Sequence, residues 1–170
     1  MQIKTLHDRP YVTLDSVDRK IIDLLNDNAR MSYTDIGKEV GLTRVAVQLR
    51  LQSLVDNGVI ESFTLAVNPE PAGFYLTAFF EISVEPRELE KLAEEIMDHP
   101  PVTLLYQLSG PSKLHMYGQF IDQVEMEGYL KTKLYVLPGI TNVDFQIVIH
   151  MYKNRMALRP LGDAVRLYQP

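Results

Sequence analysis

Polar side chains spaced along residues 43–52 have the chemistry needed to contact a DNA duplex. Glutamine can form two hydrogen bonds with adenine, and arginine two with guanine, in the major groove. Arginine and the free N–H groups at a helix start can also bind phosphate. We expect the outer face of one helix to carry these side chains: Thr43, Arg44, Gln48, Arg50 and Gln52. Ser32 and Tyr33, at the start of a preceding helix, complete the candidate DNA-contacting set. The same pattern also fits a structural three-helix bundle whose outer face is merely soluble.

The sequence lacks the residue patterns of the common catalytic, metal-binding and nucleotide-binding sites. No cysteine is present, which excludes disulfides, thiolate metal sites and cysteine nucleophiles. The four histidines, at positions 7, 99, 115 and 150, form no HxxxH or HExxH pair. P-loop, GxSxG and Rossmann patterns are also missing. We therefore expect no catalytic residue, no metal and no cofactor.

Three short helices are predicted in the first third of the chain. Asp15 or Ser16 can cap the first of them, Ser32 the second and Thr43 the third, because their side-chain oxygens accept hydrogen bonds from the first turn. Apolar residues recur at helical spacing behind each cap. Gly41 can end the second helix, which leaves a tight turn before the third. This arrangement indicates a helix-turn-helix, whose third helix enters the major groove.

The rest of the chain predicts a four-stranded sheet with two helices. Residues 61–67 alternate like a strand, and the proline-rich residues 68–73 read as a linker. The elements that follow have the order β-α-β-β-α-β, which is the ferredoxin-like plait with both helices on one face of the sheet. The fold class is therefore α+β, a winged-type helix-turn-helix joined to a ferredoxin-like domain. We divide the chain into five segments: an N-terminal extension (1–13), a helix-turn-helix DNA-binding domain (14–60), a strand with linker (61–73), a sheet domain (74–152) and a basic tail (153–170).

The helix-free face of the predicted sheet carries a mixture of apolar and polar side chains. We assign to it Thr77, Phe79, Leu105, Gln107, Tyr117, Gln119, Gln146 and Val148. This face is too apolar to leave in water, and large apolar patches mark association. We expect it to pack on the same face of a second copy, as an isologous dimer. The alternative is a solvated sheet face with scattered aromatic residues.

Net charge and hydropathy narrow the possible partners. The 170 residues carry a net charge of −5, and the acidity is concentrated in residues 63–150, which hold five basic and twelve acidic residues. The helical domain, with six basic and eight acidic residues in 14–62, can still present a locally positive face. No apolar run approaches the roughly 18 residues of a membrane span, so a cytoplasmic protein without a membrane partner is expected.

The first half of the chain resembles the Lrp/AsnC, or feast/famine, transcription regulators. The resemblance runs without gaps from residue 14 to residue 60 and rests on Leu14, Asp15, Asp18, Arg19, Ile21, Ile22, Leu24, Leu25, the run Asn28–Ser32, the run Asp35–Thr43, and Val47, Arg50, Leu51, Leu54, Gly58, Val59 and Ile60. The sheet domain is similar to the family's ligand-sensing and oligomerisation domain, the RAM domain, through Gly110 and the run Leu137–Ile140. The resemblance implies sequence-specific binding to double-stranded DNA. It also implies dimers joined through the sheets, with assembly into tetramers or octamers, pairing of strand 63–67 with its copy, and modulation by an amino acid.

The hairpin that holds the effector in this family departs from the family pattern here. The candidate effector-binding residues are Ser109, Gly110, Ser112, Lys113, Gly139, Val143 and Phe145. Lys113 stands where the family has an aspartate that suits an ammonium group, and Val143 and Phe145 stand where it often has threonines. Two hypotheses follow. Either the effector carries an extra acidic group that Lys113 holds, or the pocket has lost its small-molecule role.

Two further functions are compatible with the resemblance. A thin base-reading face also suits an architectural protein that wraps DNA with weak sequence choice. A branch of the family resembles siroheme decarboxylases, which need histidine and basic residues around a tetrapyrrole. The cap at Thr43 and the continuous match over residues 42–60 favour the DNA-binding regulator over the enzyme.

Overall fold

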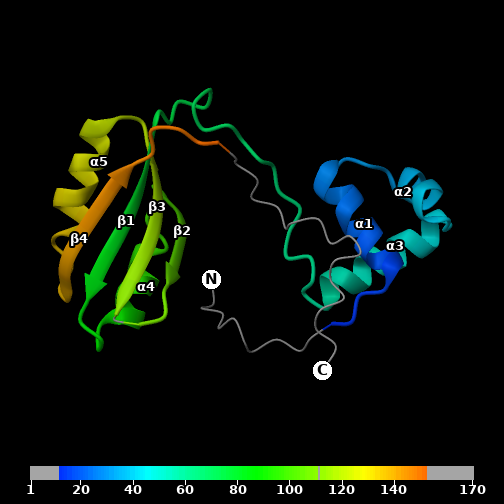
Figure 1. Ribbon diagram of the computed structural model, residues 1–170, viewed down its shortest axis with the longest axis horizontal. Coiled ribbons are helices and arrows are strands. Elements are labelled where there is room, and N and C mark those ends of the chain that lie inside the picture. The colour runs from blue at the N-terminus through cyan, green and yellow to red at the C-terminus, as the bar shows by residue number, and fades with distance from the viewer. Residues whose placement is uncertain (1–11, 111, 153–170) are drawn as a thin grey trace. The chain divides into compact units, whose positions relative to one another are not determined.

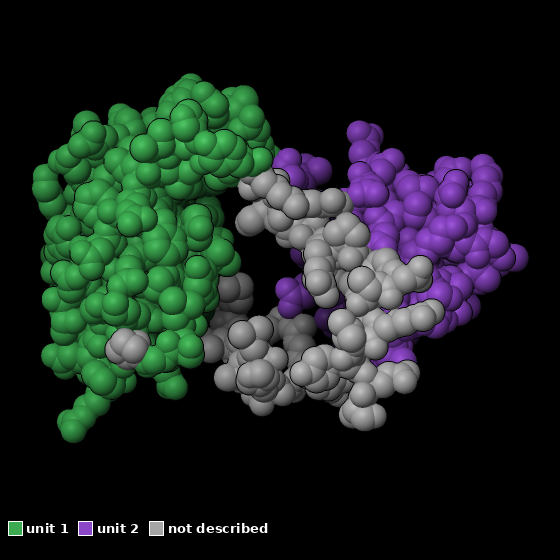
Figure 2. Space-filling model, in the orientation of Figure 1, with its two compact units in different colours: residues 1, 67–153 green, residues 2–66, 154–170 purple. Residues whose placement is uncertain are grey.

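The computed structural model describes residues 12–110 and 112–152, so most of the expected N-terminal extension and the tail from residue 153 lie outside the described residues. The described chain separates into two compact units, residues 12–66 and residues 67–152. Figure 1 shows their elements and Figure 2 colours them purple and green. None of the helices in these described ranges is long and apolar enough to cross a membrane.

The helical unit contains three helices that begin at predicted caps, and Asp15 rather than Ser16 caps the first. They are α1 (Ser16–Asp27), α2 (Tyr33–Val40) and α3 (Arg44–Asp56). The side chains of Asp15, Ser32 and Thr43 accept hydrogen bonds from backbone N–H groups three residues on, at 2.7, 3.1 and 3.2 Å. Each cap satisfies a donor that the helix itself cannot pair.

A small core and a glycine turn hold these helices together. The buried residues come from all three helices: Ile21, Ile22, Ile36, Val47, Leu51 and Leu54. Gly41 ends α2 at φ +70°, in the left-handed region that favours glycine. The side chain of Lys20 on α1 also donates to the carbonyl of Glu39, near the end of α2.

The second unit is an antiparallel sheet with strand order β2-β3-β1-β4, which confirms the ferredoxin-like fold. Its elements are β1 (Leu76–Val84), α4 (Leu89–Ile96), β2 (Val102–Gln107), β3 (Lys113–Phe120), α5 (Gln123–Tyr129) with a π-helical turn η1 (Leu130–Leu134), and β4 (Ile140–Ile147). One face of the sheet packs on the helices through a core that includes Phe80, Met116, Leu92, Ile96 and Leu134.

The register of β2 differs from the sequence prediction. Leu105 pairs with Met116 and Gln107 with Leu114, which places both on the helix-covered side of the sheet. The open face carries Leu104 and Tyr106 instead. The cause is an irregularity between residues 102 and 104, because one extra residue moves every later side chain of a strand to the other face.

The predicted strand at residues 61–67 is also wrong for the single chain. These residues form no regular element, and Phe63, Leu65 and Val67 are 61, 82 and 63% exposed. A strand needs a hydrogen-bonded neighbour, and none of the described strands pairs with this segment. The apolar side of the alternation therefore faces solvent in one copy.

Candidate functional site

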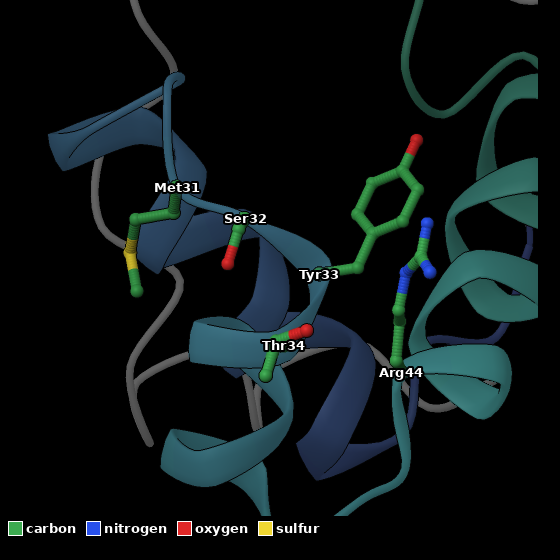
Figure 3. Close-up of a pocket in the computed structure, with 5 residues that line it drawn as sticks. All are labelled: Met31, Ser32, Tyr33, Thr34 and Arg44. Atoms are coloured by element: carbon green, nitrogen blue, oxygen red, sulfur yellow. The ribbon is translucent and has the colours of Figure 1, made fainter.

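The starts of α2 and α3 meet at a shallow hollow on the helical unit. The hollow has a volume of about 420 Å³ and is lined by Met31, Ser32, Tyr33, Thr34 and Arg44. Figure 3 shows the side chains of Tyr33 and Arg44 projecting in the same direction from the two helix starts. The first turn of α3 contains no acidic residue. The start of α3 concentrates partial positive charge, so the side of the hollow next to Arg44 is suited to an anion such as a phosphate. The first turn of α2 instead carries Asp35, which forms an ion pair with Lys38 at 2.8 Å.

The outer face of α3 continues away from the hollow. Thr43, Arg44, Gln48 and Gln52 are all exposed, so four of the predicted contacts lie on accessible surface. The Nε2 atom of Gln52 donates to Oδ1 of Asp56 at 2.8 Å. Asp56 places a negative charge at the C-terminal end of this face, which would oppose a phosphate there. The N-terminal half of α3 is therefore the part suited to approach a polyanion.

Arg50 does not lie on that face as the sequence predicted. Its Nη1 donates to Asp15 and to Asp18, both at 2.7 Å, so the guanidinium ties α3 to the capping box of α1. The backbone N–H of Asp18 and the guanidinium of Arg50 together hold the pKa of Asp15 below its usual value. Hydrogen bonds from the guanidinium to Asp15 and Asp18 raise the pKa of Arg50. The geometry gives Arg50 a positioning role within the helical unit.

Replacing Arg50 with methionine should therefore lower stability without changing base preference. We expect the free energy of unfolding to fall by about 1 kcal/mol, a value discounted because the Arg50 side chain is one-third exposed. Urea unfolding measures this loss, and sequence selection from a random duplex pool measures base preference. Gln48→Ala is the matched control and should give the opposite result. A changed consensus in the Arg50 variant with unchanged stability would contradict this role.

Two apolar residues on the outer face of α3 escaped the sequence analysis. Val45 is 64% exposed and Leu49 is 66% exposed, one turn apart on the same side as Gln52. From the sequence we assign only polar residues to that face. The sequence could have indicated their exposure. Val47, Leu51 and Leu54 form the buried side of α3, and helical spacing places Val45 and Leu49 away from that side.

The open face of the sheet gathers aromatic and charged side chains. The register places Phe79 beside Tyr117 and Gln146, and Glu81 beside His115 and Asp144. The ring of His115 stacks on Tyr106 with centroids 5.7 Å apart, and its centroid lies 5.0 Å from that of Phe79. His115 is only 7% exposed, although it belongs to the face without helices.

Lys113 forms an ion pair on this face that the sequence analysis did not include. Its Nζ donates to Oε1 of Glu81, and Nε2 of His115 lies 3.4 Å from the other oxygen of Glu81. The hydrogen bond from Lys113 holds the pKa of Glu81 below its usual value. The charge of Lys113 is therefore compensated within the chain, and a ligand does not meet it as an isolated cation.

The predicted effector residues divide between two places. Ser112 and Gly139 come together at the end of β1, where their carbonyls accept hydrogen bonds from Val84 and Glu85 at 2.9 and 2.8 Å. Lys113 pairs with Ser83 on the open face at the same end, next to the exposed hairpin residues Ser109 and Gly110.

Val143 and Phe145 do not belong to that group. They pair with Ile82 and Phe80, on the helix-covered side of the sheet. Their side chains are therefore separated from Lys113 by the sheet itself.

Known proteins resemble both units. Residues 14–55 match the AsnC-type helix-turn-helix domain, and residues 77–158 match the Lrp/AsnC ligand binding domain. An uncharacterized HTH-type transcriptional regulator of Pyrococcus horikoshii is 31% identical over 142 residues, which cover 84% of this chain and 90% of the relative. The HTH-type transcriptional regulator Ptr1 of Methanocaldococcus jannaschii is 28% identical over 83% of this chain and 95% of its own.

Solved structures share the fold. The L-Met complex of a transcriptional regulator from Neisseria meningitidis has a TM-score of 0.81 at 23% identity and covers 86% of this chain and 97% of its own. Escherichia coli AsnC has a TM-score of 0.78 at 20% identity, with 85% and 97% covered. The 31% identity with the P. horikoshii regulator, together with the two matched domains, shows that the chain belongs to the Lrp/AsnC family of HTH-type transcriptional regulators.

Proposed function

We propose that this regulator binds double-stranded DNA with the starts of α2 and α3, and that it is not an enzyme. The observation that carries the proposal is the hollow between the two helix starts, which Ser32, Tyr33 and Arg44 help to line. A phosphate at this position would orient α3 so that Gln48 faces base edges, because phosphate contacts set the register that base contacts read. Transcriptional regulation rather than catalysis is also the role named for the relatives.

Arg44→Ala tests the phosphate contact. Loss of one such contact should weaken binding to all duplexes about equally and reduce the salt dependence of the binding constant by about one per protomer. Fluorescence anisotropy on selected and scrambled duplexes at several salt concentrations measures both. Arg87→Ala, an exposed arginine in the other unit, is the control and should change neither. Weakening confined to the selected sequence would instead assign Arg44 to base reading.

We further propose that two copies associate through the open faces of their sheets. Each copy leaves Phe79, Leu104 and Tyr106 without a cover from its own helices, and the exposed apolar side of residues 61–67 offers a second element that could pair with its copy. A two-fold dimer would present two α3 helices to a roughly palindromic site. Linked half-sites would raise the effective concentration and compensate for few phosphate contacts per copy.

We propose an amino acid as the effector, bound at the hairpin end of the open face. The N. meningitidis regulator was solved with L-Met, and the ion pair in this chain supports a zwitterion better than a diacid. Because Lys113 and Glu81 are already paired, a zwitterion would insert into this ion pair, with its carboxylate on Lys113 and its ammonium group on Glu81 and the neighbouring Asp144.

Calorimetric titration separates these ligand classes. We expect at least one of the twenty amino acids to bind, and its 2-oxo acid counterpart, which lacks the ammonium group, to bind at least about tenfold more weakly. Lys113→Ala and Glu81→Gln should each weaken binding of the amino acid, because each variant removes the side chain that pairs with one charge of the ligand. Equal binding of the 2-oxo acid, or of the Glu81 variant, would contradict the assignment.

A further inference from the structure

The outer face of α3 combines two chemistries that favour the same base pair. Gln48 can form two hydrogen bonds with adenine, while aliphatic side chains contact the methyl group of thymine. Val45 and Leu49 lie one helical turn apart, and Gln48 adjoins them on the exposed side. All three belong to the N-terminal half of α3, which has no acidic residue in its first turn.

The exposed side chains of Val45 and Leu49 suggest a surface that a binding partner covers. Their side chains are 64 and 66% exposed, whereas the core of the helical unit is already filled by Val47, Leu51 and Leu54. A DNA duplex offers a partner to each of these side chains. Thymine methyl groups in the major groove suit the aliphatic pair, adenine suits Gln48, and phosphates at the rim of the groove suit Arg44.

We propose that Val45 and Leu49 are specificity-determining residues that contact thymine methyl groups in the major groove. With Gln48 on adenine, the half-site facing α3 is then rich in A·T pairs that are read directly. This inference rests on the proposed binding of DNA by α3 and adds the base class and the residues that select it.

Uracil substitution tests the contact without altering base pairing. Wild-type full-length protein selects duplexes from a random pool, and the enriched duplex is then synthesised with thymine or with deoxyuridine. Because each buried methyl group contributes about one methylene equivalent, the thymine duplex should bind about fourfold more tightly per contacted methyl. Val45→Ala and Leu49→Ala should each bring this thymine-to-uracil ratio toward one, with little change in affinity for the uracil duplex.

Matched variants exclude indirect causes. Val124→Ala truncates a valine that is 78% exposed in the other unit and should leave the ratio unchanged. Leu49→Met keeps an apolar contact of similar volume and should retain most of the ratio. Circular dichroism confirms that each variant keeps its helices.

The outcomes separate this inference from the proposed function. Selective binding with equal affinity for thymine and uracil duplexes overturns the methyl contact and leaves DNA binding intact. A change of oligomeric mass in the Val45 or Leu49 variants, with an unchanged thymine-to-uracil ratio, overturns it in favour of a protein interface. Failure of the wild-type chain to enrich or bind any duplex overturns both proposals.

Discussion

Alanine at Gly37 should destabilise the helical unit and abolish most DNA binding, although alanine is ordinarily the better helix former. A Cβ at Gly37 would lie 2.5 Å from the carbonyl oxygen of Leu42, a separation that requires the backbone to shift. The N–H of Leu42 donates to the carbonyl of Gly37 at 2.9 Å, so the two segments cannot separate without losing this bond. Leu42 directly precedes the cap Thr43, and any shift therefore moves the start of α3.

The expected size of the effect follows from overpacking. Forcing extra atoms into a packed site costs about 1–3 kcal/mol, and the collision here is with backbone, which cannot rotate away as a flexible side chain could. In a unit of this size such a loss is a large share of the total stability. We expect at least about a tenfold loss of DNA affinity, because the hollow between α2 and α3 is deformed as well.

Gly128→Ala supplies the control, because Gly128 lies in α5 and a Cβ there meets nothing within 4 Å. Helix propensity alone predicts that both substitutions stabilise by about 1 kcal/mol. We expect stabilisation or no effect at Gly128 and destabilisation at Gly37, measured by urea unfolding, with DNA binding measured by anisotropy. Equal behaviour of the two variants would show that the contact with Leu42 does not constrain the turn.

Local signals in the sequence predicted the helical unit well. Asp15, Ser32, Gly41 and Thr43 act within one helical turn of their positions, so residue type and spacing identify the caps and the turn directly. The order of strands and helices was predictable for a similar reason. Alternation in β1 and helical spacing in α4 depend only on neighbours in the sequence.

Contacts between residues far apart in the chain could not be predicted from the sequence. Arg50 has helical spacing with exposed polar residues, but its two carboxylate partners lie 32 and 35 positions away in the sequence. The side chains of β2 turn over at an irregularity that its sequence, VTLLYQ, does not reveal, because apolar residues occur on both faces. The ion pair of Lys113 with Glu81 likewise depends on the register between β1 and β3.

Two adjacent phenylalanines in β1 should separate folding from association. Phe80 is fully buried, with its ring centroid 6.0 Å from that of Phe120 and 5.9 Å from that of Phe145. Phe80→Ala should lower the free energy of unfolding by about 3–5 kcal/mol, because truncation leaves a cavity in a core that cannot fully relax. Urea unfolding should show this loss at every protein concentration.

Phe79→Ala should act on the dimer instead. The ring of Phe79 lies on the open face, 5.2 Å from that of Tyr117, where the proposed partner copy would cover it. Truncating a central aromatic residue of an interface commonly costs more than 1 kcal/mol, so the dimer dissociation constant should rise about tenfold or more. Because association stabilises the folded chain by mass action, the wild-type unfolding midpoint should increase with protein concentration, and the Phe79 variant should lose much of that increase. The contrary result is that Phe79→Ala lowers the unfolding midpoint equally at all protein concentrations and leaves the mass from light scattering unchanged. In that case two copies do not meet at the open face of the sheet, and another surface must bring the second α3 helix to the operator.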